Sequence, residues 1–150
     1  MNKFTPKDPD FEKKIRDSFS SQGLLQNFGA EIYRIAPGEV ELMMRFDEKL
    51  TQQDGFLHAG AIITLVDSAC GYAAYSLMPA DSRVLSVEFK INLLTPANGA
   101  RFLARGTVIK PGRNISVCEG KFFTYQNGEE KLTALMQATM ICIRDIQQTK

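Results

Sequence analysis

The chain has 150 residues, of which 44% are hydrophobic and 23% are charged. That length suits one globular domain with a sizeable core and excludes a multidomain protein. Eighteen basic and seventeen acidic side chains give a net charge of +1, so the chain as a whole has no electrostatic attraction to nucleic acid or to an anionic membrane. We therefore expect a small-molecule ligand.

Three cysteines, Cys70, Cys118 and Cys142, lie far apart in apolar runs. Their odd number and wide spacing fit neither a disulfide framework nor a zinc site, so we interpret them as reduced core residues and expect no metal. The first residues, MNKFTPKDPDFEKK, lack the apolar stretch of a signal peptide, and no run approaches the roughly 18 apolar residues of a membrane span. We predict a cytoplasmic protein with no membrane and no nucleic-acid partner.

The first 30 residues predict a short amphipathic helix that packs on the rest of the domain. Phe11, Ile15 and Phe19 stand four apart in an otherwise polar segment. After a turn at Pro37-Gly38, apolar residues occur at every second position over 40–46. That alternation predicts a half-buried strand.

One long helix is predicted from about Ala59 to Met78, where Pro79 ends it. Apolar side chains occur on nearly every face of this segment, in contrast to a helix at the protein surface. Such a helix is buried on most sides and needs cover from several other elements.

Four alternating segments follow the helix and predict strands over about 85–93, 100–110, 115–125 and 131–143. We expect them to pair in chain order as a meander, with Phe89 on one face of its strand and Ser86 on the other. A curved antiparallel sheet around the helix would give both elements their cover. The predicted class is α+β, with one domain over 1–150 that includes a helical extension over 1–30, and the order of elements excludes a doubly wound parallel sheet. The predicted turns are Pro96-Ala97-Asn98-Gly99, Lys110-Pro111-Gly112-Arg113 and Asn127-Gly128.

Asp67 lies in the middle of the apolar helix, in the sequence IITLVDSACGYAA. A buried carboxylate without a partner is costly, so this acid needs a hydrogen bond or neutralisation. An aspartate within a helix usually faces solvent, but this helix has no broad polar face. A narrow stripe of small or polar residues beside it would permit close approach by a ligand or another chain. The stripe consists of Thr64, Ser68, Gly71 and Tyr75.

The start of the helix, His58-Ala59-Gly60, is a second candidate. The N–H groups of a first helical turn have no partner within the helix, and together with the helix dipole they favour an anion or a carbonyl that becomes one. A simpler interpretation makes His58 an exposed capping residue and Gly60 a turn residue, and a lone histidine by itself favours that interpretation.

The spacing of the two candidates predicts a dimer. Asp67 follows Ala59 by eight residues, which is about 12 Å along a helix. A general base must come within about 3 Å of its proton, or reach it through one water. If the two residues cooperate, they therefore belong to different subunits, with antiparallel helices across a two-fold axis. The sequence points to a homodimer with shared sites.

Three segments together resemble the hotdog-fold acyl-CoA thioesterases, in particular the PaaI-like branch of phenylacetic acid degradation. They are LHAGAIITLVDSACGYAA, SVEFKINLLTPA and VIKPGRNISVCEGKFF, and the resemblance covers about 52–143. It implies a hotdog fold, hydrolysis of an acyl-CoA to a free acid and coenzyme A, and a site shared across a dimer that can pair into a tetramer. It implies no cofactor, because coenzyme A is part of the substrate.

The resemblance also implies roles for single residues. The family's His-Gly-Gly motif corresponds to His58, Ala59 and Gly60, so the oxyanion donor would be the backbone N–H of Ala59. The family's acid corresponds to Asp67. Gln52 takes the place of an asparagine that orients the carbonyl or the water. Two further correspondences are Gln53, which could substitute for that glutamine, and Ser86, which in some relatives helps to place the water.

The phosphates of coenzyme A would contact the Lys-Pro-Gly-Arg turn. Arg113 is the first candidate, and Lys90 and Lys110 are weaker ones. Residues 83–121 carry seven basic and two acidic side chains, a net charge of +5, which agrees with such a contact. Solvated outer faces of strands explain most of these charges equally well.

Several questions stay open at the level of sequence. Asp67 would either activate water as a general base or attack the thioester directly. The acyl group could be aryl, medium-chain or branched, and Phe56, Leu57 and Tyr72 are either a pocket wall or ordinary core. The alanine at 59 and the glutamine at 52 favour an alternative, a non-catalytic acyl-CoA-binding hotdog domain that acts as a sensor or carrier. A hydroxyacyl dehydratase, which would use His58, is a third possibility.

Overall fold

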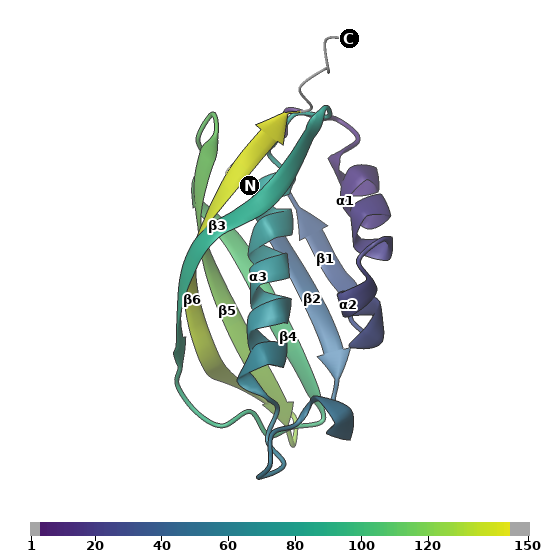
Figure 1. The fold of residues 1–150 in the computed structure, drawn as a ribbon, viewed down its shortest axis with the longest axis vertical. Coiled ribbons are helices and arrows are strands. Elements are labelled where there is room, and N and C mark those ends of the chain that lie inside the picture. Colours follow the sequence, from purple (N-terminus) through teal and green to yellow (C-terminus); the bar gives the residue numbers. More distant parts are fainter. Residues whose placement is uncertain (1–3, 145–150) are drawn as a thin grey trace.

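A six-stranded sheet and one long helix make up most of the protein (Figure 1). The computed structural model describes residues 4–144. In chain order the elements are α1 (Phe11–Ser20), α2 (Gly23–Asn27), β1 (Glu31–Ala36), β2 (Glu39–Arg45), the 3-10 helix η1 (Glu48–Leu50), α3 (Ala59–Tyr75), β3 (Ser82–Leu93), β4 (Arg101–Lys110), β5 (Ile115–Gln126) and β6 (Glu129–Arg144).

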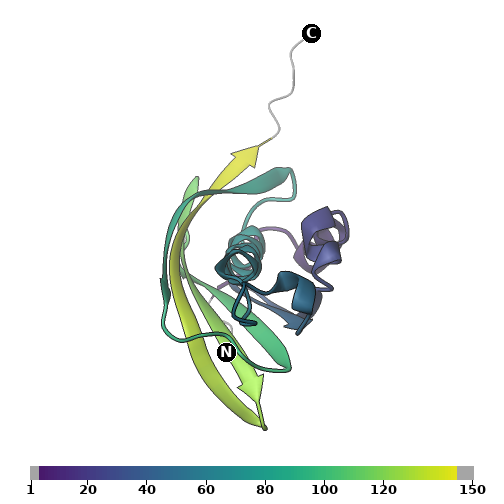
Figure 2. The same cartoon turned by 60° about the horizontal axis from the view of Figure 1, so that its bottom comes forward.

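The sheet is antiparallel and has the strand order β1-β2-β4-β5-β6-β3. Figure 2 shows it curving around α3, with the N-terminal helices, drawn in purple, beside α3 on the open side of the sheet. The concave face and the helix bury each other's apolar side chains, which is the cover that both elements need. The predicted α+β class and the hotdog fold are confirmed.

The predicted meander is wrong for one strand. β3 pairs with β6 and not with β4, and β4 instead lies between β2 and β5. The segment between β3 and β4 therefore passes from an edge of the sheet to its middle. Alternating apolar residues identify a strand but carry no information about its partner, which depends on how the connections cross the helix. As a result β3 is an edge strand.

A bulge in β3, between Ser86 and Glu88, changes which side chains face the helix. Ser86 lies opposite Met140 and Phe89 lies opposite Ala138, and both of these β6 residues are buried on the inner face. The extra residue reverses the alternation along the strand. The prediction that Ser86 and Phe89 point to opposite faces is therefore wrong, and Ser86 points toward α3.

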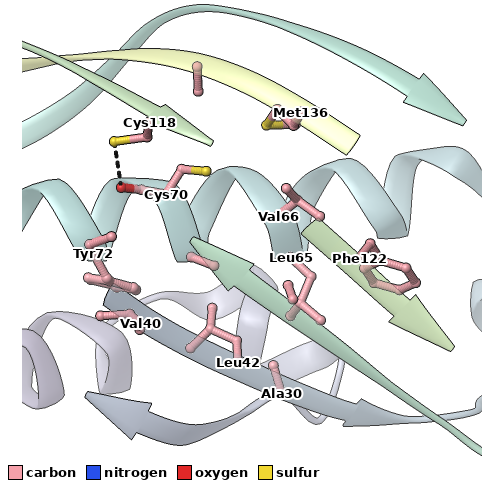
Figure 3. Packing of buried hydrophobic residues seen from close by; sticks show 14 of the residues in the cluster. Ala30, Val40, Leu42, Leu65, Val66, Cys70, Tyr72, Cys118, Phe122 and Met136 are labelled. Carbon is pink, nitrogen blue, oxygen red and sulfur yellow. Dashed lines mark hydrogen bonds between the residues drawn. The ribbon is translucent and has the colours of Figure 1, made fainter. Parts of the chain in front are cut away.

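Close contact between α3 and the sheet depends on two glycines. A Cβ atom on Gly106 of β4 would lie 2.3 Å from the backbone carbonyl of Ala69, and one on Gly120 of β5 would lie 2.3 Å from a methyl group of Val66. Only a residue without a side chain lets the helix backbone come this near. Figure 3 shows Val66 and Phe122 packed in the layer between helix and sheet.

The helix α3 ends at Tyr75, three residues before the predicted end at Met78. The hydroxyl of Ser76, the next residue, donates to the carbonyl of Ala73 at 2.6 Å and accepts a hydrogen bond from the N–H of Gly38 at 2.7 Å. A serine hydroxyl that bonds to nearby backbone groups offers them an alternative to the helical pattern. The residues up to Pro79 then form turns.

The N-terminal helix is confirmed, with Phe11, Ile15 and Phe19 buried. No pattern in the sequence predicted α2 or β1. The first is a short helix of five residues, and a bulge between Ile32 and Arg34 interrupts the alternation of the second. Between residues 4 and 144 no helix is long and apolar enough to cross a membrane.

The cysteines are unpaired, as predicted, but they differ in burial. Cys70 and Cys118 are fully buried, and the thiol of Cys118 donates to the carbonyl of Cys70 at 3.6 Å (Figure 3). Burial raises the pKa of Cys118 to about 12, so it is a thiol at neutral pH. Cys142 is only half-buried, so the prediction of a core position is correct for two of the three.

Candidate active site

Among the residues that the structure describes, no partner is found for one backbone N–H of the first turn of α3. His58 precedes the helix, and its Nδ1 accepts a hydrogen bond from the N–H of Gly60 at 2.8 Å. The carbonyl of His58 accepts from the N–H groups of Ala61 and Ile62. No hydrogen bond within residues 4–144 uses the N–H of Ala59. This N–H is available to an oxygen atom of a ligand, and the helix dipole strengthens the attraction.

A hollow of about 390 Å³ lies beside Ala59. Its walls come from the loop before α3, the first turn of α3, and the segment that leaves β3. Gln52 and Thr95 are polar residues in this lining, and most of the remainder is apolar. The apolar lining consists of Phe56, Leu57, Ile62, Leu93, Leu94, Pro96 and Ala97. A free amide at the edge of a mostly apolar space suits an acyl group whose carbonyl points to the amide.

Gln52 lines this hollow, but its side-chain amide is engaged within the loop. Its Nε2 donates to Oδ2 of Asp54 at 3.3 Å, and its Oε1 accepts a hydrogen bond from the N–H of Asp54. Gln53 is exposed, does not line the hollow, and donates to the same carboxylate at 3.4 Å. Gln52 must therefore release Asp54 before it can orient a substrate.

Asp67 and Ser86 meet directly. The Ser86 hydroxyl donates to Oδ1 of Asp67 at 2.7 Å, a contact that the bulge in β3 makes possible. Burial raises the pKa of Asp67 above its usual value, and the hydrogen bond from Ser86 lowers it by a smaller amount. A carboxylate whose pKa is raised accepts a proton more readily, as a general base must.

Within one chain, Asp67 does not reach the hollow beside Ala59. It is absent from the lining, and eight residues of α3, about 12 Å, separate the two positions. Ser68 and Gly71, on the same side of the helix, are half-exposed. This face of α3 is therefore uncovered in a single chain. Four of the five predicted catalytic residues form two separate groups, Ala59 with Gln52 and Asp67 with Ser86. The fifth, His58, caps the helix next to Ala59.

The three candidate phosphate ligands lie in different places. Arg113 lines a small hollow at the C-terminal end of α3. Lys110 is exposed at the end of β4. Lys90 lies opposite the exposed Gln137 of β6, so it points to the outer face of the sheet, away from the Asp67 of its own chain. Arg113 therefore lies at a hollow, whereas Lys90 and Lys110 are exposed on the sheet.

Of the three residues that the sequence offered as a pocket wall, Phe56 and Leu57 line the hollow and Tyr72 does not. Tyr72 is buried, and its hydroxyl accepts a hydrogen bond from Nε2 of Gln22 at 2.6 Å, which ties the N-terminal segment to α3. Leu93 and Leu94 belong to the lining but were missed. Their signal in the sequence is a pair of leucines where a predicted strand ends and a loop begins.

An antiparallel sheet wrapped around a single central helix places this protein in the class of hotdog folds. Comparison with known proteins then gives the family: residues 54–131 match the model of the thioesterase superfamily, and the chain belongs to that family. It is a thioester hydrolase.

Named proteins with similar sequences support membership of the thioesterase superfamily. A putative esterase of Halobacterium salinarum is 30% identical over 110 residues, which cover 70% of this chain and 72% of the relative. The 1,4-dihydroxy-2-naphthoyl-CoA hydrolase of Listeria monocytogenes is 26% identical over 118 residues, 79% of this chain and 94% of the hydrolase.

Solved structures also match. A thioesterase family protein from Silicibacter pomeroyi is 48% identical, with a TM-score of 0.88 over 89% of this chain and 98% of its own. The PaaI protein of the Escherichia coli phenylacetic acid degradation operon has a TM-score of 0.81 at 18% identity, covering 89% of this chain and 94% of its own. At that identity the likeness to PaaI shows the shared fold.

Proposed function

We propose that this protein hydrolyses acyl-CoA thioesters as a homodimer, with Ala59 of one subunit and Asp67 of the other acting on the same carbonyl. The observation that carries the proposal is the N–H of Ala59, which is unused within residues 4–144 and lies at the edge of an apolar hollow. The second half of the site is Asp67, on a partly exposed face of the same helix, with Ser86 of β3 bonded to it.

The edge strand β3 supports the dimer. Leu85, Val87 and Phe89 are 56%, 53% and 40% exposed, although they are apolar and belong to a strand with one open edge. An edge of this kind invites pairing with another strand. Two copies of β3 that pair antiparallel about a two-fold axis would bury these side chains.

The same pairing would bring the two halves of the site together. In each chain β3 begins near the C-terminal end of α3 and ends beside the hollow at its N-terminal end, where Leu93 is part of the lining. Antiparallel pairing of two such strands places the hollow of one subunit near the middle and the C-terminal half of the partner's α3. Asp67 lies in that part of the helix.

The proposed reaction uses the N–H of Ala59, the carboxylate of Asp67 and one water, with no metal or redox cofactor. The N–H donates to the carbonyl oxygen as negative charge develops on it. Asp67 takes a proton from the water that attacks the carbonyl carbon. The C–S bond then breaks and Asp67 returns the proton to the leaving sulfur, which gives the free acid and the thiol of coenzyme A. In the other route, Asp67 attacks first and water hydrolyses the mixed anhydride.

The hollow beside Ala59 indicates the acyl group. Its volume of about 390 Å³ and its apolar lining, which includes Phe56, suit an aryl or medium-chain acyl group. The Listeria relative is named for an aromatic acyl-CoA, which favours the aryl choice. A panel of aryl, medium-chain and branched acyl-CoAs, assayed by thiol release, would rank them. A cytoplasmic location and the pairing of dimers into tetramers stay predictions.

Assays of thiol release with two variants test the proposed roles of Asp67 and Ala59. Asp67→Asn keeps the shape and the acceptor for Ser86 but removes the base, so kcat should fall by about 10²- to 10⁴-fold. Ala59→Pro removes the N–H, and proline is favoured at the first position of a helix, where His58 before it already has the extended backbone that proline requires. The kcat of this variant should fall by about 10²- to 10³-fold. Ala59→Val, which adds bulk and keeps the N–H, is its control.

Mixing the two inactive variants tests whether the site is shared. If Ala59 and Asp67 of different subunits act together, a heterodimer of Asp67→Asn with Ala59→Pro has one intact site, and an equal mixture should regain about a quarter of the wild-type activity. No recovery after subunit exchange would place both residues in a site within one chain. Tight binding of acyl-CoA by the wild type with no thiol release would instead favour a sensor.

A further inference from the structure

The hydroxyl of Ser86 has two acceptors within hydrogen-bond distance, and they belong to different elements. Its Oγ lies 2.7 Å from Oδ1 of Asp67 on α3 and 3.5 Å from Sδ of Met140 on β6. A carboxylate is a strong acceptor, whereas a thioether sulfur is a weak one. Because a hydroxyl carries a single proton, Ser86 donates mainly to the carboxylate while Asp67 is charged.

Met140 holds its sulfur in a fixed place. It is fully buried, it belongs to the core between α3 and the sheet, and it lies directly opposite Ser86 in the ladder of β3 and β6. The bulge in β3 turns Ser86 onto the face that Met140 occupies. Since side chains in a packed core stay close to one rotamer, the sulfur needs no rearrangement to accept from Ser86.

Met140 is the second and last partner of the Ser86 hydroxyl within residues 4–144. Ser86 is exposed in a single chain, so water also reaches it there. The proposed pairing of two β3 strands would reduce this access, because the partner's strand would lie against the edge that carries Ser86. In the dimer the sulfur would then be the remaining alternative to Asp67.

Protonation of Asp67 changes what Ser86 must do. In the proposed reaction Asp67 takes a proton from the attacking water, and a protonated carboxyl group can donate as well as accept. When Oδ1 carries this proton, it donates to Oγ of Ser86, and the Ser86 proton must turn to another acceptor. The sulfur of Met140 lies within reach of it. Ser86 keeps its own proton throughout, and only the direction of two hydrogen bonds changes.

No charged side chain of the sheet faces Asp67 within residues 4–144. The side chains of β2, β4, β5 and β6 that pack against α3 are uncharged, and burial raises the pKa of the Cys118 thiol among them to about 12. On α3 itself, burial raises the pKa of Cys70 well above its ordinary value, and Lys14 of α1 binds a carbonyl beyond the last turn. The charged residues of β3 lie opposite outer-face residues of β6; they are Arg83, Glu88 and Lys90. Burial and the Ser86 hydroxyl are therefore the two influences on the pKa of Asp67.

We propose that Met140 is a positioning residue for the hydrolysis: its sulfur accepts the hydrogen bond of Ser86 when Asp67 is protonated, and so stabilises the protonated acid between its two proton transfers. The proposal rests on the proposed function, in which Asp67 is the general base. While Asp67 is charged, Ser86 donates to it and the sulfur is not needed. Loss of the sulfur therefore raises the free energy of the protonated form alone, which lowers the pKa of Asp67.

Met140→Leu tests the role of the sulfur, since leucine has a similar volume and no acceptor. The acid limb of the pH profile of kcat/KM should move to lower pH by about 0.4 units, the shift expected for loss of a weak hydrogen bond. Ser86→Ala, which removes the donor to the carboxylate, should move the limb to higher pH. Met136→Leu is the matched control, because Met136 is also a buried methionine on the inner face of β6 (Figure 3) but lies opposite Ile91. It should leave the limb in place.

The double variant separates a hydrogen bond from a change in packing. Met140→Leu should have no effect on the limb in the Ser86→Ala background, because the sulfur acts through the hydroxyl. A change in the burial of Asp67 would instead move the limb equally in both backgrounds. An unmoved limb in Met140→Leu, or an equal shift in the two backgrounds, overturns the proposal. Met140→Ile, which also lacks an acceptor and suits a strand, serves if the leucine variant folds poorly.

A wild type that releases no thiol from any acyl-CoA would overturn the proposed function, and a measurement without substrate then decides the role of Met140. The carboxyl carbon of Asp67, assigned by loss of its NMR signal in Asp67→Asn, is titrated in the wild type, in Met140→Leu and in the double variant. A lower pKa of Asp67 in Met140→Leu, absent in the Ser86→Ala background, supports the contact. An equal pKa in the wild type and Met140→Leu overturns it.

Discussion

Two opposing effects determine the pKa of the Asp67 carboxyl group. Burial raises its pKa, and the Ser86 hydroxyl, which donates to it, lowers the pKa by stabilising the charged form. Because the folded-state pKa is above the ordinary value, the folded chain binds more protons than the unfolded chain in the range between the two. Asp67 therefore destabilises the fold increasingly as the pH rises through that range, and this cost is fully present above the raised pKa.

The hydrogen bond from Ser86 gives a prediction about pH dependence. In the proposed reaction the carboxylate is the active form of Asp67, so kcat/KM should rise as the pH increases through its raised pKa. Ser86→Ala removes a group that stabilises this charge, so the acid limb of the profile should move to higher pH. A pH series of thiol release for wild type and Ser86→Ala measures the shift. Ser86→Thr, which keeps the hydroxyl, should remain close to the wild type, and an unmoved limb in Ser86→Ala would contradict the role given to Ser86.

At the scale of elements, the position of α3 decides where the site residues lie. The helix sits so close to β4 that the backbone of Ala69 occupies the place of a side chain at Gly106. The bulge in β3 then turns Ser86 toward the helix, opposite Asp67. The closeness of α3 to the sheet and the extra residue in β3 together bring Ser86 into hydrogen-bond contact with Asp67, and this contact lowers the pKa of Asp67.

Gly106→Ala tests the close approach. The added methyl group meets backbone atoms of α3 that cannot rotate away, so the helix must shift, and the free energy of unfolding should fall by about 1–3 kcal/mol. Chemical denaturation measures the change. Gly23→Ala in α2 is the control, since nothing lies within 4 Å of the added atom and alanine is the better helix former there. Equal effects of the two substitutions would show that α3 is not seated on Gly106.

At the scale of the whole molecule, the two halves of the proposed site do not meet within one chain. Ala59 lies at the N-terminal end of α3, and Asp67 lies about 12 Å further along the helix, on a partly exposed face. The edge strand β3, which contacts α3 through the hydrogen bond from Ser86 to Asp67, carries the exposed apolar residues. Pairing of two β3 strands accounts for both the exposed apolar side chains and the divided site.

Val87→Lys tests this arrangement. Val87 is 53% exposed, so a lysine there should leave the folded chain intact while it places two like charges across the two-fold axis. We expect a monomer in light scattering coupled to size exclusion, together with loss of thiol release. Ile109→Lys, at a position that is 50% exposed near the end of β4, should keep the dimer and its activity. A Val87→Lys dimer with full activity would exclude β3 as the interface.

The sequence by itself determined the class of fold and the position of the candidate acid within the helix. The helix that is apolar on nearly every face, the alternating segments after it and Asp67 within the helix are local patterns, and side-chain periodicity is sufficient to detect them. Pairing of β3 with β6, the bulge that joins Ser86 to Asp67, and the hollow made by Leu93 and Leu94 were decided only by the tertiary structure. Each of these depends on contacts between residues distant in the chain, and these contacts follow from how the connections pass around α3 rather than from any local pattern.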